Sequence, residues 1–319
     1  MRYVSLANLS EIIRRNFHKI PHDIDLVVGI PRSGMIPASI IALLLNTRLT
    51  DIDSFVNYGS IQSNGLTRGN FVRNQKIKKI LIVDDSICSG QSMENAKKKL
   101  QSLPLGDYNF VFCAPIATTP GSAMVNLAFE IIDDNRIFEW NIFHHSLLQN
   151  ACIDIDGVLC VDPDEDDDGS IYRNFLQTAK PLFTPTCKVN TLISCRLEKY
   201  RHLTEEWLQR NSISYDKLIL LNLPSKAARI AWNRHGEYKG EYYKQHPEYV
   251  IFIESSSRQA KIIADVSHKP VYCVETNTLI TAAEPISQKR RILHLLKKTF
   301  PKGYRRIKKT YYKAIGHPL

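Results

Sequence analysis

The fold of the first half of the chain is decided by the stretch Ile80-Leu81-Ile82-Val83-Asp84-Asp85-Ser86-Ile87-Cys88-Ser89-Gly90-Gln91-Ser92. Its apolar start predicts a buried strand, which is followed by two carboxylates and then by a small, hydroxyl-rich loop that enters a helix. Backbone N–H groups and hydroxyls at a helix start suit a phosphate monoester, and carboxylates at a strand end suit sugar hydroxyls or a hard cation. A surface turn with a helix N-cap at Ser92 is the alternative. Because strand, acid pair and loop occur in this order, we favour a ligand site.

This segment resembles the phosphoribosyl pyrophosphate signature of the type I phosphoribosyltransferases. The resemblance implies that Asp84 and Asp85 hold the ribose 2- and 3-hydroxyls and that the following loop holds the 5-phosphate. The loop residues assigned to this donor are Ser86, Ser89, Gly90, Gln91 and Ser92. In the implied reaction, Mg2+ and arginine neutralise the departing pyrophosphate while C1 passes through an oxocarbenium-like state. Attack from the opposite face would give a β-ribofuranosyl 5-phosphate.

A second element lies about 55 residues before the acid pair, at Val28-Gly29-Ile30-Pro31-Arg32-Ser33-Gly34-Met35. It resembles the pyrophosphate loop of the same family, which implies that Arg32, Ser33 and Gly34 contact the diphosphate. A turn would explain G-x-P-R-S-G equally well if it stood alone. Its position upstream of the acid pair favours the ligand loop.

Two features of this first block leave alternatives open. The segment 58–73 is either a mobile loop that closes over the reaction, with Arg68 and Arg73 as candidate ligands, or a plain surface loop. Purine-salvage members of the family place an aspartate base where this chain has Cys88, which puts purine salvage in doubt. We interpret Cys88 itself as a packing residue.

A second acidic motif, Asp154-Ile155-Asp156-Gly157-Val158-Leu159, follows the apolar run Ala151-Cys152-Ile153. Two carboxylates at i and i+2 at the carboxyl end of a strand can face one magnesium ion and one phosphate. The first would then serve as nucleophile and the second as general acid/base. Calcium loops and acidic turns have similar patterns, so the motif needs support from elsewhere in the chain.

The motif resembles that of the haloacid-dehalogenase phosphatases, and three further motifs of that family occur in the same order. The resemblance implies that Ser194 binds phosphate, that Lys239 neutralises it, and that Glu254 is an acidic magnesium ligand together with Asp154 and Asp156. The competing lysines are Lys226 and Lys244. Three serines follow Glu254 where many members have another aspartate, a departure that puts magnesium binding in doubt and for which Asp265 is not expected to compensate.

Charged residues around this motif allow more than one interpretation. The acidic run 162–168 lies where the family places its flap, and it is either a solvated loop, which we favour, or a second cation site. Arg196 and Arg201 either recognise substrate phosphate through their guanidinium groups or belong to an exposed helical charge pattern.

Both blocks alternate apolar, strand-like runs with helical patterns, which is typical of parallel α/β domains. We therefore expect two Rossmann-like parallel-sheet domains, residues 1–145 and 146–284, followed by a basic tail, residues 285–319. The expected strands are residues 24–30, 80–83, 110–116, 151–155, 191–194, 218–221, 250–253 and 271–274.

The basic balance of the chain comes from its last residues. The formal net charge is +10, and Gln288–Leu319 alone contains eleven Lys or Arg residues and no acid. Leucine, isoleucine and tyrosine alternate with these basic residues, a composition that suits the surface of an anionic bilayer. A disordered, solubilising tail is the alternative. No recognised nucleic-acid module accompanies the charge, so nucleic acid is not an expected partner.

The order of the two blocks resembles transferase–phosphatase fusions that install ribofuranose in bacterial surface polysaccharides. This resemblance implies a lipid-linked glycan acceptor and a peripheral location at the inner face of the cytoplasmic membrane. Two alternatives are a nucleobase transferase fused to a nucleotidase, and a regulator that senses phosphoribosyl pyrophosphate without turnover. Seven cysteines without a C-x-x-C pair indicate reduced thiols. We expect no signal peptide, and a homodimer is compatible with the sequence.

Overall fold

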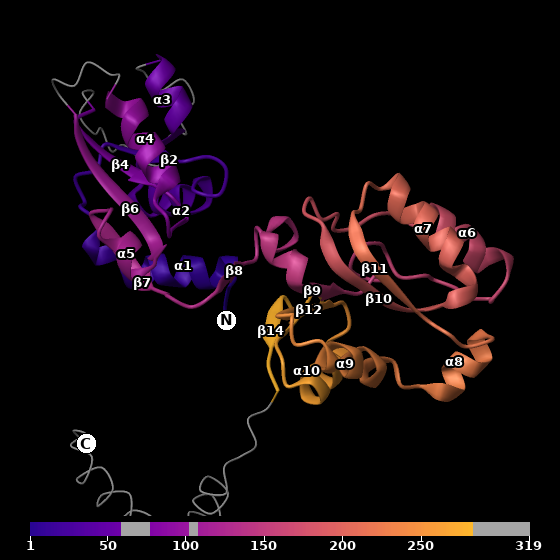
Figure 1. Ribbon diagram of the computed structural model, residues 1–319. Helices are drawn as coiled ribbons and strands as arrows, with labels where there is room; N and C mark the ends of the chain where they lie inside the picture. The colour runs from indigo at the N-terminus through magenta and orange to yellow at the C-terminus, as the bar shows by residue number, and fades with distance from the viewer. Residues whose placement is uncertain (59–76, 102–107, 283–319) are drawn as a thin grey trace, which may run out of the picture. The chain divides into compact units, whose positions relative to one another are not determined.

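The computed structural model describes residues 1–58, 77–101 and 108–282. The proposed mobile loop after residue 58 and the basic tail lie outside the described residues. The chain divides into two compact units, Met1–Ile142 and Phe143–Leu319. The structure thus puts the division a few residues before the expected boundary at residue 145. Each unit is described by itself below (Figure 1).

The first unit is built on a parallel sheet with the strand order β3-β2-β4-β6-β5, in which β7 also pairs with β6. The strands of this sheet are β2 (Leu26–Gly29), β3 (Arg48–Asp51), β4 (Lys79–Val83), β5 (Ser86–Ile87), β6 (Asn109–Ala117) and β7 (Leu127–Ile131). The helices are α1 (Leu6–Arg15), α2 (Met35–Leu45), α3 (Ile52–Tyr58), α4 (Gln91–Gln101) and α5 (Thr119–Ser122). A separate parallel pair joins β1 (Arg2–Val4) to β8 (Arg136–Phe138).

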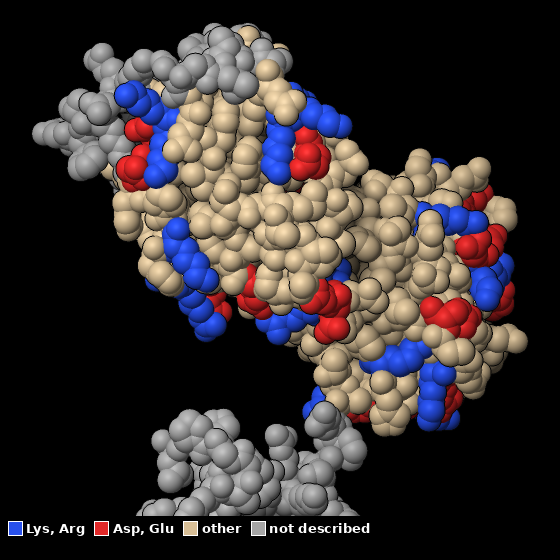
Figure 2. All heavy atoms as spheres, turned by 60° about the vertical axis from the view of Figure 1, so that its left-hand side comes forward, with Lys and Arg blue, Asp and Glu red and all other residues tan. Residues whose placement is uncertain are grey.

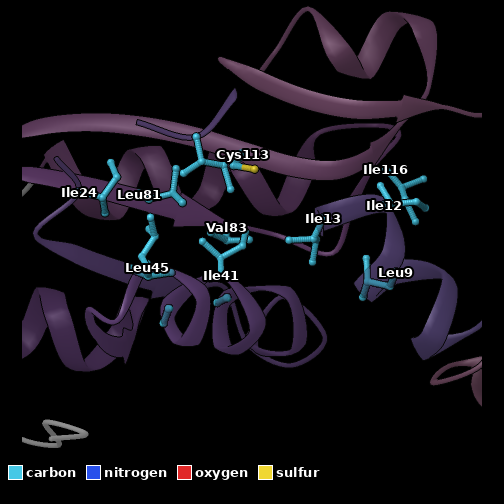
Figure 3. Packing of buried hydrophobic residues seen from close by; sticks show 14 of the residues in the cluster. Leu9, Ile12, Ile13, Ile24, Ile41, Leu45, Leu81, Val83, Cys113 and Ile116 are labelled. Carbon is cyan, nitrogen blue, oxygen red and sulfur yellow. The ribbon is translucent and has the colours of Figure 1, made fainter. Parts of the chain in front are cut away.

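Successive residues of the central strands face opposite sides of this sheet, as strand geometry requires. On one side, Leu81 and Val83 of β4 pack with residues of α1 and α2, and Figure 3 shows Ile13, Ile41 and Leu45 meeting them there. On the other side, the neighbouring strand residues pack with α3 and α4. Helices therefore cover both faces, which explains why the central strands are apolar throughout.

The second unit has the strand order β11-β10-β9-β12-β13-β14, with only β14 antiparallel to its neighbour. Its strands are β9 (Ala151–Ile153), β10 (Val189–Leu197), β11 (Tyr215–Leu221), β12 (Ile251–Glu254), β13 (Val271–Cys273) and β14 (Thr278–Ile280). Its helices are α6 (Ser170–Thr178), α7 (Arg201–Arg210), α8 (Lys226–Trp232), α9 (His235–Gln245) and α10 (Ser257–Ser267). Short 3-10 helices precede β9 and α7. Helices α9 and α10 pack on one hydrophobic cluster of the sheet, and α6 and α7 contribute to another.

The prediction of α/β architecture with parallel sheets is confirmed. The expected strands all occur, although β10 and β11 begin before their expected starts and β9 ends at Ile153. Figure 2 shows basic side chains lying beside acidic ones over the visible face, without a large patch of one sign. No helix in the described part of the chain is long and apolar enough to span a membrane.

Candidate functional site

The sheet of the first unit brings the two proposed donor loops together. Gly29, at the end of β2, pairs with Val83, at the end of β4, and the N–H of Ile30 donates to the carbonyl of Val83 at 2.9 Å. A Cβ atom on Gly34 would lie 2.5 Å from the Ile30 oxygen and 3.0 Å from the Asp84 Cα atom. The loop from Ile30 to Gly34 therefore approaches the acid pair so closely that only glycine fits at its last position. The Pro31–Arg32 peptide bond in this loop is cis.

The acid pair is buried at the carboxyl end of β4. Asp84 is 7% exposed and Asp85 is 6% exposed. The N–H of Asp85 donates to Asp84 Oδ1 at 2.9 Å, which holds the first carboxylate in place. Burial raises the pKa of Asp84 to about 7, and the negative charge of Asp85 adds to this effect. Hydroxyl donors from a sugar would compensate the buried charge of this pair.

The loop after the acid pair leads directly into α4. Gly90 has a φ of +76°, a left-handed conformation that favours glycine, and its added Cβ would lie 2.1 Å from Met124 Cε. Helix α4 begins at Gln91, so Ser92 lies in its first turn, and the alternative of an N-cap at Ser92 is wrong. The interpretation of Cys88 as a packing residue is also wrong, because Cys88 is exposed beside the exposed Ser89.

Two residues that the sequence analysis missed contact the donor loops. The indole Nε1 of Trp140 donates to Asp85 Oδ2 at 2.7 Å. One residue later, Asn141 Oδ1 accepts a 2.7 Å hydrogen bond from the guanidinium of Arg32. No local pattern distinguishes these residues in the sequence, because they follow a strand of only three residues. The contacts arise from tertiary folding.

In the second unit, the ends of β9 and β12 place two predicted residues around Lys239. Its Nζ atom donates to Asp154 Oδ2 and to Glu254 Oε2, both at 2.7 Å, and to Gln259 Oε1 at 3.1 Å. Burial opposes the charge on Lys239, but Asp154 and Glu254 outweigh it and raise the pKa of this ammonium above its ordinary value. Of the three lysines considered, Lys239 is therefore the one that the structure brings to the acidic residues.

The two competing lysines lie elsewhere. Lys244 is exposed on α9. Lys226 donates its ammonium to the backbone carbonyl of Asp166. The carboxylates of Asp154 and Glu254 are therefore contacted by Lys239 and not by these two lysines.

Asp156 lies beside Ser194 but is held by Arg196. The Ser194 hydroxyl donates to Asp156 Oδ2 at 3.5 Å, and the Arg196 guanidinium donates to Asp156 Oδ1 at 2.7 Å and Oδ2 at 3.1 Å. Burial alone would raise the pKa of Asp156, but Arg196 holds it below its ordinary value. Arg196 is a fully buried residue of β10, so both earlier interpretations of it, substrate arginine and exposed helical charge, miss its observed role as the partner of Asp156.

The register of β10 explains where Ser194 lies. Regular pairing with β11 runs to Ile193 and shifts between Ile193 and Leu197. Ser194 stands at this irregularity, within the strand rather than at its end. Arg201, by contrast, pairs with Glu198 and Glu205 on the half-exposed side of α7, which agrees with the helical charge pattern.

The acidic run after the second motif is mostly exposed, in agreement with a solvated loop, but Asp166 and Asp168 have side-chain partners. Asp168 accepts from the Tyr200 hydroxyl at 2.8 Å and pairs with Lys199 at 2.7 Å. Asp166 forms an ion pair with Arg229. These partners tie the run to the segments before α7 and in α8. Within residues 1–58, 77–101 and 108–282, no group of three or more His, Cys, Asp or Glu side chains is arranged to hold a metal ion.

Comparison with known proteins gives a family match within the first unit. The family described as "Phosphoribosyl transferase domain" matches residues 3–103. These residues are a phosphoribosyl transferase domain, as the donor motifs predicted, and the match supports transferase activity in this part of the chain. The match ends before the second unit, and a comparison with curated proteins gives no match.

Solved structures show more distant likenesses. The xanthine-guanine-hypoxanthine phosphoribosyltransferase of Helicobacter pylori is 18% identical, with 44% of this chain and 92% of that chain covered and a TM-score of 0.33. A purine phosphoribosyltransferase from Pyrococcus horikoshii is 16% identical, with 43% and 91% covered and a TM-score of 0.30. A chain in the structure of the Pnkp1/Rnl/Hen1 RNA repair complex is 14% identical, with 85% and 94% covered and a TM-score of 0.31. With scores this low, the assignment rests on the family match.

Proposed function

We propose that this chain transfers 5-phosphoribosyl from phosphoribosyl pyrophosphate to a glycan and then removes the 5-phosphate to leave ribofuranose. The transferase step follows from the first unit. The observation that carries the second step is the position of Lys239 between Asp154 and Glu254, at the carboxyl ends of two adjacent parallel strands. Parallel sheets bind their ligands at this edge.

In the transferase step, Asp84 and Asp85 hold the ribose hydroxyls and the loop from Ser86 to Ser92 holds the 5-phosphate. Arg32 and the backbone at Gly34 hold the pyrophosphate. The bond between C1 and the pyrophosphate oxygen breaks, the acceptor hydroxyl forms the new bond to C1, and its proton leaves to a base. Mg2+ bound with the donor would neutralise charge on the departing pyrophosphate.

In the phosphatase step, Asp154 attacks the phosphorus of the new 5-phosphate and the bond to the sugar oxygen breaks. Water then hydrolyses the aspartyl phosphate. Lys239 and Ser194 neutralise and hold the phosphate oxygens. Asp156, oriented and kept ionised by Arg196, serves as the base that takes the proton of the attacking water, while the sugar oxygen is protonated from solvent. The strand order with β9 between β10 and β12 supports these roles, since it brings Ser194 of β10 beside the motif that follows β9. Lys239 reaches the same motif from α9.

The metal set proposed for this unit needs one change. Asp154 and Glu254 fit a Mg2+ site, because both are buried carboxylates that converge on a single cation, the Lys239 ammonium. Asp156 does not fit as a side-chain ligand, because Arg196 occupies both of its oxygens. When bound, Mg2+ would neutralise the phosphate during attack.

The two steps are connected by their chemistry, since the first makes the phosphate monoester that the second consumes. The decisive experiment supplies phosphoribosyl pyrophosphate, Mg2+ and a lipid-linked glycan to the full chain. Pyrophosphate release with mass gain of one ribose on the glycan supports the proposal. Release of pyrophosphate only with free nucleobases would establish the nucleobase transferase with a nucleotidase. Donor binding without turnover of any acceptor would indicate a sensor.

The basic tail supports a location at the inner face of the cytoplasmic membrane. Each basic residue near an anionic bilayer contributes roughly 1 kcal/mol of attraction. A lipid-linked acceptor would be presented at the same surface.

A further inference from the structure

The segment Glu139–Asn141 contacts both donor loops of the first unit, although it belongs to neither. Trp140 donates to Asp85 in the loop after β4, and Asn141 accepts from Arg32 in the loop after β2. Two consecutive residues thus hold one residue from each half of the donor site. The family match ends at residue 103, so it does not include this segment.

The segment is itself fixed on its far side. The N–H of Glu139 donates to the carbonyl of Val4 at 3.0 Å, and Glu139 Oε2 accepts from the N–H of Leu6 at 2.7 Å. The Trp140 ring stacks on Phe138, with ring centroids 4.9 Å apart. These contacts fasten the segment to the start of α1 and to β8. A side chain held in this way can orient a neighbour, because its own rotamer is already restricted.

Both contacts leave room for the donor. A carboxylate has two oxygens, and Trp140 occupies only Oδ2 of Asp85. A guanidinium has five N–H groups, and the contact with Asn141 uses a single terminal nitrogen of Arg32. The segment and the donor can therefore bind these two residues at the same time, so the contacts position the residues rather than block them.

We propose that Trp140 and Asn141 are positioning residues for the donor: Trp140 turns the Asp85 carboxylate toward the ribose, and Asn141 turns the Arg32 guanidinium toward the pyrophosphate. This inference rests on the proposed donor roles of Asp85 and Arg32. Because Trp140 acts on the ribose half of the donor and Asn141 on the pyrophosphate half, each role can be tested with its own probe.

The test measures binding by calorimetry on the full chain in Mg2+ buffer, with phosphoribosyl pyrophosphate, ribose 5-phosphate and pyrophosphate as separate probes. Trp140→Phe keeps the ring stacked on Phe138 but removes the N–H. We expect it to weaken ribose 5-phosphate about tenfold, the scale of one hydrogen bond to a charged group, and to leave pyrophosphate unchanged. Asn141→Ala should weaken the binding of pyrophosphate and leave the binding of ribose 5-phosphate unchanged. Equal weakening of both probes by either variant would indicate a merely structural role and overturn the proposal.

Two controls separate the possible failures. Trp207→Phe removes an indole N–H that donates to the Ala179 carbonyl at 2.8 Å in the second unit, and it should not change donor binding. In an Asp85→Ala background, Trp140→Phe should lose most of its effect, because no side-chain oxygen remains to accept the indole N–H. An undiminished effect there would contradict action through Asp85. If the unaltered chain fails to bind phosphoribosyl pyrophosphate, the proposed function itself is wrong; if it binds and Trp140→Phe binds as tightly, only this inference falls.

Discussion

Lys239 donates a 2.7 Å hydrogen bond to Asp154, a residue that lies 85 positions earlier in the chain. Both side chains are almost completely buried, and the same ammonium contacts Glu254. A buried cation between two carboxylates compensates two negative charges that water cannot reach. Removal of one member of such a set leaves unpaired charge in the interior.

Lys239→Met should therefore destabilise the second unit by about 3–5 kcal/mol and abolish phosphatase activity. Lys244→Met is the matched control, since Lys244 is an exposed lysine of the same helix, and its effect should remain within about 0.5 kcal/mol. Chemical denaturation of both variants gives the comparison. Equal stability of the two would show that Lys239 does not neutralise the buried carboxylates.

Asp154→Asn should stall the enzyme after the first step, so that the glycan acquires phosphoribose instead of ribose. The amide is nearly isosteric with the carboxylate but cannot form the aspartyl phosphate. Mass spectrometry of the glycan should find a product heavier by one phosphate group. Addition of Asp84→Asn/Asp85→Asn protein in trans should remove that phosphate. Unphosphorylated ribose from Asp154→Asn alone would disprove the sequential scheme.

Asp84→Asn combined with Asp85→Asn should abolish pyrophosphate release, because the ribose hydroxyls lose both carboxylate acceptors. Hydrolysis of a phosphate monoester by the second unit should persist, since its residues lie on a separate sheet. Both rates can be followed in one preparation, with phosphate and pyrophosphate assayed separately. Transferase turnover at the normal rate would remove the donor assignment.

Relative to the wild type, the Asp84→Asn variant should become more stable as the pH rises. The pKa of Asp84 is about 7 in the folded protein and 3.8 as the ordinary value, so ionisation costs folded-state stability between these two pH values. The wild type should therefore lose stability from about pH 4 to pH 7 relative to the variant, on the order of 4 kcal/mol in total. Thermal unfolding of both proteins between pH 5 and pH 8 measures this difference. A constant difference across that range would contradict the raised pKa.

Truncation after Glu284 should leave both enzymatic activities intact in solution and weaken binding to anionic vesicles. The removed segment contains the eleven basic residues counted in the sequence. Salt should reduce vesicle binding by the intact chain, because counterions screen exposed charges. Sedimentation with vesicles of anionic and of neutral lipid provides the measurement. If truncated and intact chains bind equally, the tail is not a membrane anchor.

The sequence predicts much of both sites because parallel strands align their carboxyl ends. Asp84, Asp154 and Glu254 each follow or end an apolar run, so the sheet necessarily brings them to its ligand-binding edge. The predicted order of strands and helices also identifies the architecture. These features depend on local patterns, which are visible in one sequence.

Contacts made by side chains from remote segments could not be predicted in this way. Trp140 and Asn141 follow a strand of three residues, too short for a periodic signal. The choice of Lys239 over Lys226 and Lys244 depends on the direction in which α9 faces the sheet. The ion pair between Arg196 and Asp156 forms because β10 continues to Leu197, beyond the expected end at residue 194. The apolar pattern stops at that expected end, so the sequence contains no sign of the longer strand.

Each of the hydrophobic clusters found among the described residues draws its members from one unit alone, either before Ile142 or after Phe143. A defect in one unit should therefore leave the other correctly folded. In a cell that expresses two defective alleles, one altered at Asp84 and one at Asp154, each protein would supply the step that the other lacks. If the two units act as separate catalysts, mutant alleles of this kind should therefore complement each other genetically.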